Sequence, residues 1–332
     1  MARPDSHIPV LAREVIEVLA PQPGDVLLDC TAGLGGHAAV MAPALGHAGT
    51  MVLCDLDVGN LARAEVVVRA AAPDIRVIAL HTNFAAAPQR LLELGLAADC
   101  VLGDLGFSSN QMDTAARGMS FMREGPLDMR LDASSGVSAA DLVATLSGAE
   151  LEEILREYGE ERCAWQIAQK VVTERARQPI TTTAQLAAIV RSVVGRHGGG
   201  GNAAIDDATR TFQALRIAVN DELGNLGALL EHVRRAAGVL AGARGRGGEA
   251  PATRGTWLSP GSRVAIIAFH SLEDRPVKQA FAALVEKGLA ESMTRKPITA
   301  GDEEIARNPR SRSAKLRAVR IGAANRGVDG LH

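Results

Sequence analysis

A glycine-rich turn followed by an acidic residue is the first feature of this sequence that could carry chemistry. The segment Asp29 to His37 reads Asp-Cys-Thr-Ala-Gly-Leu-Gly-Gly-His and lies between an apolar run and an alanine-rich, helix-forming stretch. Glycines at such a turn let a ligand approach the backbone and the following helix N-terminus closely. The next apolar run ends in Cys54-Asp55, about 20 residues further on, where a carboxylate can accept hydrogen bonds from ribose hydroxyls. The pattern predicts a nucleotide-like ligand, with Asp55 as the ribose acceptor.

The same turn is compatible with a second class of enzyme. Gly33, Gly35 and Ala38 also satisfy the G-x-G-x-x-G/A fingerprint of dinucleotide-binding folds, so a nicotinamide-dependent oxidoreductase stays open as an alternative. A purely structural role, as a tight turn and a helix-capping acid, is less favoured. The reason is that the glycines and the acid occur together at two adjacent strand ends.

A second acidic residue, Asp104, follows the fourth apolar run. The segment Asp104-Leu105-Gly106-Phe107 has the spacing acid-x-x-aromatic. This spacing resembles the D-P-P-Y motif of enzymes that methylate exocyclic amines, although both prolines are missing. Ligands of a doubly wound sheet meet at the carboxyl ends of its strands, so Asp104 should face the same crevice as the glycine turn. We interpret Asp104 as a catalytic residue and Phe107 as the candidate for stacking on a base. The alternative assigns Asp104 wholly to the nucleotide-like ligand and leaves proton acceptance to a backbone carbonyl or water.

Alternating strands and helices must position these residues. Short apolar runs and helix-forming stretches alternate between Val26 and Leu105, which predicts βαβ units and a parallel sheet. The expected strands are Val26–Cys30, Thr50–Cys54, Ile75–Leu80, Cys100–Leu102, Arg263–Phe269 and Leu316–Ile321. The expected helices are Ala38–Leu45, Leu61–Ala72, Ala85–Leu94 and Pro276–Leu284. The predicted fold class is therefore α/β, with a doubly wound, mostly parallel sheet.

The alternation stops in the middle of the chain. Residues 138–194 show helical periodicity, with capping boxes at Ser147/Glu150 and Thr182/Gln185, and no convincing strand. We therefore predict an inserted all-helical domain, with Tyr158 and Trp165 in its core. The expected division is a first core part at 1–110, a loop plus helical insertion for substrate recognition at 111–208, and a second core part with a basic tail at 209–332. The Gly-rich stretches 197–202 and 241–255 are expected to be surface loops.

Composition excludes several classes of protein. Hydrophobic residues make up 47% of the 332 residues, and no run approaches the roughly 18 to 20 apolar residues of a membrane span. The start of the chain lacks the pattern of a secretory signal, so we expect a cytoplasmic protein without membrane contact. Cysteine spacing favours buried thiols over a disulfide framework or a metal site. The cysteines are Cys30, Cys54, Cys100 and Cys163.

A net charge of −2 means that any nucleic-acid surface must be local. The segment 295–320 is rich in arginine and could be such a patch or simply a solvated surface. A second group of arginines alternates with acids, so internal ion pairing competes with phosphate contact. This group consists of Arg117, Arg123 and Arg130 beside Asp113, Glu124 and Asp128. Two more segments have two readings each. Met119, Phe121 and Met122 could contact a base or form an apolar cluster, and residues 270–274 could line the crevice or simply begin a helix.

Seven blocks, in order and over nearly the whole chain, resemble the RsmH (MraW) family of 16S rRNA cytosine-N4 methyltransferases. The blocks are His7–Leu11, Gly35–His37, Asp104–Ser109, Arg117–Arg130, Tyr158–Arg162, Thr209–Arg216 and Phe269–Arg275. The resemblance implies a Rossmann-like class I methyltransferase core with a helical insertion. It also implies S-adenosylmethionine as the methyl donor and a cytosine of 16S rRNA as the substrate, in the assembled small ribosomal subunit near its decoding centre.

The resemblance also implies which residues contact the donor: Gly35, Gly36, His37, Asp55, Phe84, Asp104 and Gln111. Departures from the family pattern concern loops. Ala32 and Leu34 replace an aromatic and a basic residue in the glycine turn, and Asn110 replaces a proline. Two rivals stay open beside the oxidoreductase: a ribosome-assembly factor without transferase activity and a DNA cytosine-N4 methyltransferase. The oligomeric state is also open, with a homodimer as one option, and no metal is expected.

Overall fold

The computed structural model describes residues 9–197, 206–244 and 255–322 and divides the chain into two compact units. The first unit contains the chain up to Gly106 and from Gly224 onward, and the second runs from Phe107 to Leu223. The expected divisions lay after residues 110 and 208. The second division falls later because helix α10 (Thr209–Asn220) packs within the helical unit, where Phe212 and Leu215 belong to its core.

A seven-stranded sheet in the order β3-β2-β1-β4-β5-β7-β6 forms the first unit. The strands are β1 (Val26–Asp29), β2 (Thr50–Asp55), β3 (Arg76–His81), β4 (Ala98–Asp104), β5 (Leu258–Ala268), β6 (Ala290–Ser292) and β7 (Lys315–Ile321). The pairs from β3 to β5 are parallel, whereas β7 is antiparallel to β5 and β6. The strand order reverses between β1 and β4, which is where a doubly wound sheet binds its ligand.

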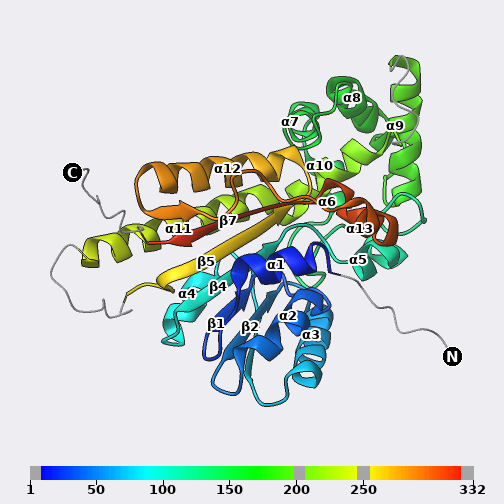
Figure 1. Ribbon diagram of the computed structural model, residues 1–332. Helices are drawn as coiled ribbons and strands as arrows, with labels where there is room; N and C mark the ends of the chain where they lie inside the picture. Colours follow the sequence, from blue (N-terminus) through cyan, green and yellow to red (C-terminus); the bar gives the residue numbers. More distant parts are fainter. Residues whose placement is uncertain (1–8, 198–205, 245–254, 323–332) are drawn as a thin grey trace. The chain divides into compact units, whose positions relative to one another are not determined.

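Helices cover both faces of this sheet (Figure 1). They are α1 (Ala12–Leu19), α2 (Gly36–Met41), α3 (Val58–Ala71), α4 (Ala87–Glu93), α11 (Glu222–Arg244), α12 (Ser271–Glu286) and α13 (Asp302–Arg307). Successive residues of β1 point to opposite faces: Leu27 packs with α1, α2 and α3, and Leu28 packs with α4, α11 and α12. Strands buried on both faces read as continuous apolar runs, which is why they were predictable.

The predicted strands and helices of the first unit are confirmed, with bounds shifted by a few residues. The elements that were not predicted include α1, α13, the 3₁₀ helix Pro309–Ser313 and the short β6. Helix α1 begins after Leu11, which has the left-handed φ of 54° and makes no side-chain cap. The usual sequence signal for a helix start is therefore missing. All four cysteines are buried, as expected for the three that lie in apolar runs. Within the described residues, no helix is both long and apolar enough to cross a bilayer.

The second unit is helical. Its helices are α5 (Ser109–Asp113), α6 (Ala139–Thr145), α7 (Gly148–Gly159), α8 (Ala164–Arg175), α9 (Thr183–His197) and α10. Both predicted capping boxes are present, at Ser147/Glu150 and at Thr182/Gln185. The prediction for Trp165 is wrong: Trp165 is 58% exposed, because it lies on the outer face of α8. Tyr158, on α7, packs against the core.

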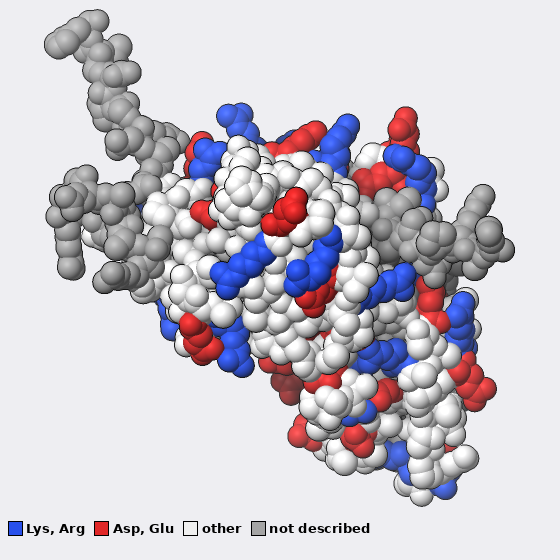
Figure 2. All heavy atoms as spheres, turned by 90° about the horizontal axis from the view of Figure 1, so that it is seen from below, with Lys and Arg blue, Asp and Glu red and all other residues white. Residues whose placement is uncertain are grey.

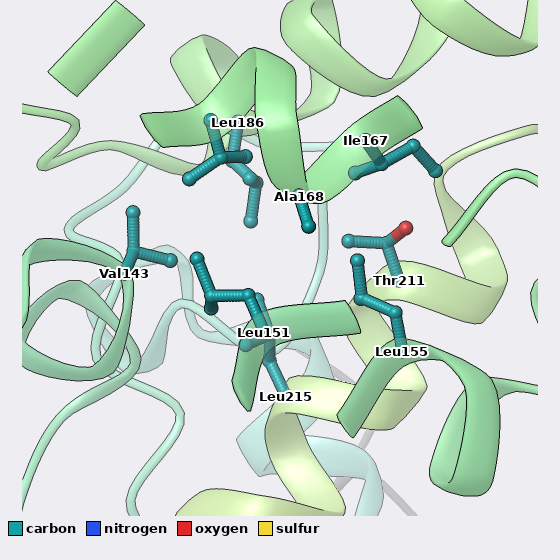
Figure 3. Close-up of a pocket in the computed structure, with 9 residues that line it drawn as sticks. Val143, Leu151, Leu155, Ile167, Ala168, Leu186, Thr211 and Leu215 are labelled. Atoms are coloured by element: carbon teal, nitrogen blue, oxygen red, sulfur yellow. The ribbon is translucent and has the colours of Figure 1, made fainter. Parts of the chain in front are cut away.

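A small apolar pocket inside this unit contains one polar atom, the Thr211 hydroxyl (Figure 3). Leucine, isoleucine, valine and alanine side chains form the rest of the lining. The Thr211 Oγ1 atom is buried and has no hydrogen-bond partner among the residues that the structure describes. We expect Thr211→Val to stabilise the helical unit by about 1 kcal/mol, because the substitution removes an unsatisfied hydroxyl at constant shape. Urea unfolding followed by Trp165 fluorescence in a Trp257→Phe background measures this.

Thr183 provides the opposite case for the same substitution. It is fully buried, but its Oγ1 donates to the Arg123 carbonyl at 3.0 Å and accepts from the Gly125 amide at 3.1 Å. Thr183→Val should therefore destabilise the unit by about 1 to 3 kcal/mol. Equal effects of the two substitutions would contradict the role assigned to these hydroxyls.

Candidate functional site

The glycine turn lies at the carboxyl end of β1, at the point where the strand order reverses. Gly35 precedes α2 with a φ of +83°, a region that suits glycine. A Cβ atom at this position would lie 2.8 Å from the Ala64 Cα of α3, so the turn is packed directly against a neighbouring helix. Gly36 opens α2 itself, where backbone amides point toward a ligand. The turn is thus a tight backbone cradle at a helix N-terminus.

Asp55 ends β2 and holds this turn in place. Its Oδ2 accepts the Gly33 amide at 2.7 Å, and its Oδ1 accepts the Asp57 amide at 2.8 Å. A carboxylate offers about four acceptor positions. Asp55 therefore fixes the backbone of the turn, and its role as the ribose acceptor stays a prediction.

Asp104 ends β4, the neighbour of β1. Its backbone amide donates to Thr31 Oγ1 at 2.7 Å, which ties the strand end to the glycine turn. Its Oδ2 lies 3.5 Å from Nδ1 of His37, and its Oδ1 is buried without a hydrogen-bond partner among the described residues. Burial and the nearby Glu273 carboxylate raise the pKa of Asp104 to about 8. A buried polar oxygen without a protein partner needs an explanation, and a catalytic role is one that fits this position.

Asp29, at the end of β1, is an acid to which the sequence analysis gave no role. The residue is 1% exposed, its Oδ1 accepts the Thr31 amide at 3.1 Å, and its Oδ2 has no partner among the described residues. Burial raises the pKa of Asp29 to about 6, although His37 and the Thr31 amide act in the opposite direction. Asp29 lies in the expected strand Val26–Cys30, but chemistry was assigned only to the acids at the ends of later strands.

This shift makes Asp29 a source of instability at high pH. The pKa of Asp29 is 3.8 in the unfolded chain and about 6 in the folded protein. Stability therefore falls as the pH rises through this range, because folding disfavours the ionised carboxyl. Asp29→Asn removes this cost. We expect the variant to be more stable than the original protein by about 2 to 3 kcal/mol at pH 8, with the gain disappearing near pH 4. Urea unfolding at a series of pH values tests this.

Asp274 on α12 is the matched control, since its pKa is shifted the other way. The Arg317 guanidinium, 2.6 Å from Oδ1, lowers the pKa of Asp274, with Lys315 adding to the effect. Its contribution is present above the unfolded pKa and is lost as pH falls through the folded one. Asp274→Asn should therefore destabilise the protein at pH 8. The same sign for both aspartates would contradict the assignment.

Glu273 and His270 lie at the start of α12, after β5. Glu273 is 3% exposed, and its Oε2 accepts the Phe269 amide at 2.8 Å. Its Oε1 lies 3.2 Å from Nε2 of His270. Of the two readings for residues 270–274, the helix start is observed, because α12 begins at Ser271. That the segment lines the crevice stays a prediction.

The remaining predicted donor contacts occupy two places. Phe84 follows β3 in the first unit and packs against its core. Gln111 belongs to the second unit, where it is 3% exposed and its Oε1 accepts the Ser108 amide at 3.0 Å as part of a capping box on α5. The first unit thus brings together Gly35, Gly36, His37, Asp55 and Asp104 around the ends of β1, β2 and β4, whereas Gln111 has a local structural role in the helical unit.

Phe107, the proposed stacking residue, has one ring face already in contact. The Arg216 guanidinium lies 4.5 Å from the ring centroid and forms a two-bond ion pair with Glu222, at 2.8 and 2.9 Å. Arg216 is the last residue of a block whose role the sequence left open. The contact is a cation–π interaction that fixes the ring plane.

Three of the arginines considered for phosphate contact have partners inside the protein. Arg130 forms a two-bond pair with Asp128, Arg123 donates to the Asp113 carbonyl, and Arg317 pairs with Asp274. Figure 2 shows basic and acidic side chains interspersed on the face that it presents. Of the apolar group, Phe121 packs edge-on against Phe212, but Met122 is 77% exposed.

Comparison with known proteins shows which family and which relatives the sequence resembles. A family model described as the MraW methylase family matches residues 5–241 and 251–321. "Ribosomal RNA small subunit methyltransferase H" of Syntrophotalea carbinolica is 44% identical over 330 residues, covering 95% of this chain and 97% of the relative. The protein of the same name from Geotalea uraniireducens is 43% identical over 329 residues, covering 94% and 97%, and that from Sorangium cellulosum is 42% identical over 325 residues, covering 97% and 93%.

The predicted fold class is confirmed: a Rossmann-like methyltransferase sheet is interrupted by a helical unit. The oxidoreductase alternative is not supported, because the match lies with methylases and covers nearly the whole sequence. From the family model and from relatives aligned along almost its full length, we conclude that this chain belongs to the MraW methylase family.

Proposed function

We propose that this protein is an S-adenosylmethionine-dependent methyltransferase that modifies the exocyclic N4 amine of a cytosine in 16S rRNA. We further propose that its substrate is the assembled small ribosomal subunit near the decoding centre. The observation that carries the proposal is Asp104, an acid with a buried oxygen lacking a partner in the described structure, beside a backbone cradle at the strand-order reversal. The names of the relatives support rRNA of the small subunit as the substrate.

The residues around the cradle fit a methyl donor of this kind. S-adenosylmethionine carries ribose hydroxyls and a positive sulfonium, and it supplies the methyl group that is transferred. The Asp55 carboxylate suits the hydroxyls, and the tight Gly35 turn admits a close approach to backbone. The buried acids Asp29 and Asp104, each with an oxygen that has no partner in the described part of the chain, suit a cationic ligand. Within the first unit, we assign donor contacts to Gly35, Gly36, His37, Asp55, Phe84 and Asp104, and the donor contact that the resemblance implies for Gln111 stays a prediction.

The protein contributes mainly position and proton acceptance. Holding the amine in line with the methyl group fixes a near-attack geometry, which accounts for much of the acceleration. The lone pair of a cytosine amine is delocalised into the ring, so an acceptor must draw on its hydrogens and take a proton as the new bond forms. We assign this role to Asp104, which a strand end holds rigidly. A base inside folded RNA must also be unstacked to be reached. We assign recognition of the RNA to the helical unit and stacking on the base to Phe107, backed by Arg216.

A transfer assay with radiolabelled S-adenosylmethionine tests the proposal. Purified small subunits, naked 16S rRNA and duplex DNA are offered in parallel, and labelled nucleosides are identified by mass spectrometry. We expect N4-methylcytidine from the small subunits. If only the DNA is labelled, the substrate is DNA and not rRNA. Subunit binding without transfer to any acceptor would instead identify a ribosome-assembly factor.

A further inference from the structure

The imidazole of His37 is held between two oxygen atoms of the first unit. Its Nε2 lies 2.8 Å from the Val10 carbonyl oxygen, and its Nδ1 lies 3.5 Å from Asp104 Oδ2. The side chain is only 7% exposed. Because a carbonyl oxygen can only accept, Nε2 must carry the hydrogen. A neutral His37 in this tautomer presents the lone pair of Nδ1 to Asp104.

A lone pair and an ionised carboxylate repel each other, so an attractive contact between Nδ1 and Asp104 requires a proton between them. It can belong to Asp104 as a neutral acid or to His37 as an imidazolium. Burial lowers the pKa of His37, whereas burial and Glu273 raise the pKa of Asp104. Both shifts favour the neutral acid.

The charged groups that act on this pair come from three elements. Asp29 on β1 and Glu304 on α13 act on His37, and Glu273 on α12 acts on Asp104. His37 itself belongs to α2 and Asp104 to β4. Every neighbour is an acid, so a proton retained within the cluster reduces the repulsion among these carboxyl groups. At 3.5 Å the contact is long, and such catalytic contacts tighten when ligands bind.

We propose that Asp104 and His37 share one proton, donated from Asp104 Oδ2 to His37 Nδ1, and that His37 thereby sets when Asp104 can accept a proton from the substrate. This inference rests on the proposed function in one respect: the group that gives its proton to Asp104 is taken to be the cytosine amine. His37 is in this account a positioning residue that acts through Asp104, beyond any contact with the donor. The role depends on the tautomer that the Val10 carbonyl fixes.

The step balances as follows in atoms and charge. The shared proton moves fully from Asp104 to Nδ1, which leaves a carboxylate and an imidazolium. The amine nitrogen then forms its bond to the methyl carbon as the sulfur–carbon bond breaks, and sulfur keeps that electron pair. Asp104 accepts the proton that the amine loses, and the imidazolium releases its extra proton to water. The original arrangement is then restored.

Nuclear magnetic resonance on the full-length protein without donor or RNA tests the shared proton directly. With ¹⁵N-labelled histidine, His37 should show a protonated Nε2 and an Nδ1 that accepts a hydrogen bond at neutral pH. With ¹³C-labelled aspartate carboxyls, Asp104 should still be protonated at pH 7. A His37 protonated at Nδ1, or an Asp104 ionised at pH 6, would overturn the proposal. Signals are assigned by comparison with His37→Phe, His37→Gln and Asp104→Asn.

Single-turnover rates against pH provide the second readout. His37→Phe removes the group that accepts the hydrogen bond of the neutral Asp104, so Asp104 should ionise more readily. The acid limb of the pH–rate profile, where the rate falls at low pH, should then move about one pH unit lower. His37→Gln keeps a donor and an acceptor and should shift the limb less. His81→Phe is the control, because His81 makes the same bond to the Leu56 carbonyl at 2.9 Å from an exposed position on β3. This variant should leave the limb in place.

The two experiments separate the possible failures. An acid limb that is unchanged in His37→Phe would overturn the role of His37 even if the protein methylates rRNA normally. Absence of transfer to any RNA would overturn the proposed function, while the resonance measurement would still decide whether the proton is shared. If His37→Phe does not fold, the spectra of the unaltered protein, assigned through the other two variants, decide alone.

Discussion

Asp104→Ala is expected to slow methyl transfer by roughly 10²- to 10⁴-fold in single turnovers at saturating donor, the range associated with loss of a general base. The Asp104 carboxyl is the one acid at the end of β4, and Thr31 Oγ1 binds the backbone of the same residue. The truncation therefore removes the acceptor without removing the tie between strand and turn. Rapid-quench transfer to small subunits measures the rate, and calorimetry measures donor affinity.

Asp104→Asn separates hydrogen bonding from proton acceptance. An amide oxygen can still accept a hydrogen bond from the cytosine amine, but it does not take up the proton. We expect this variant to bind donor and subunits better than Asp104→Ala while remaining slow in single turnovers. If either variant loses donor affinity but keeps its rate at saturating donor, Asp104 serves the donor alone. Proton acceptance then passes to a backbone carbonyl or water.

Gly35→Ala is expected to abolish measurable donor binding and to destabilise the protein by about 3 kcal/mol or more. The new Cβ would meet the Ala64 Cα at 2.8 Å and the Ala64 carbonyl oxygen at 3.1 Å, both backbone atoms of α3. The φ of +83° adds strain for any residue with a side chain. Because α3 cannot move without disturbing β2, the turn itself must shift. Urea unfolding and calorimetric titration with S-adenosylmethionine measure the two effects.

Gly24→Ala is the matched control for this prediction. Gly24 has a φ of +91°, almost the same strain, but a Cβ at this position would have no described atom within 4 Å beyond its chain neighbours. We expect a loss of about 1 kcal/mol in stability and no change in donor affinity. Should the two glycines respond equally, backbone strain and not the close packing of the turn on α3 would explain the effect of Gly35→Ala.

The fold was largely predictable because buried parallel strands announce themselves as apolar runs between helix-forming stretches. Features of the fold that depend on contacts with distant parts of the chain could not be predicted. Helix α1 begins without a capping side chain, and α10 is amphipathic in a way that fits either unit until its packing is known. Trp165 was assigned to the core because its spacing from Tyr158 fits one face of a single helix. The chain instead ends α7 at Gly159 and begins α8 at Ala164, and Trp165 is exposed.

The site was predictable only as far as strand ends locate side chains. Asp55 and Asp104 follow strands that meet at one edge, so their proximity to the glycine turn could be inferred. The side chain of His37 could not be placed, because its orientation depends on a carbonyl 27 residues earlier in the chain. Asp29 was overlooked for a similar reason: nothing local in the sequence indicates how deeply α2 and β4 bury it.

The interruption of the sheet has a consequence for how the protein is made. Strand β4 ends at Asp104 and its partner β5 begins only at Leu258, with the entire helical unit between them. During synthesis, the half-sheet β3-β2-β1-β4 therefore emerges with one edge unpaired, while the helical unit, rich in local contacts, can already fold. Until β5 has left the ribosomal exit tunnel, the exposed edge of β4 can pair with a wrong strand. Closure of the β4 edge is therefore a late step of folding, after every residue assigned to the donor has been synthesised.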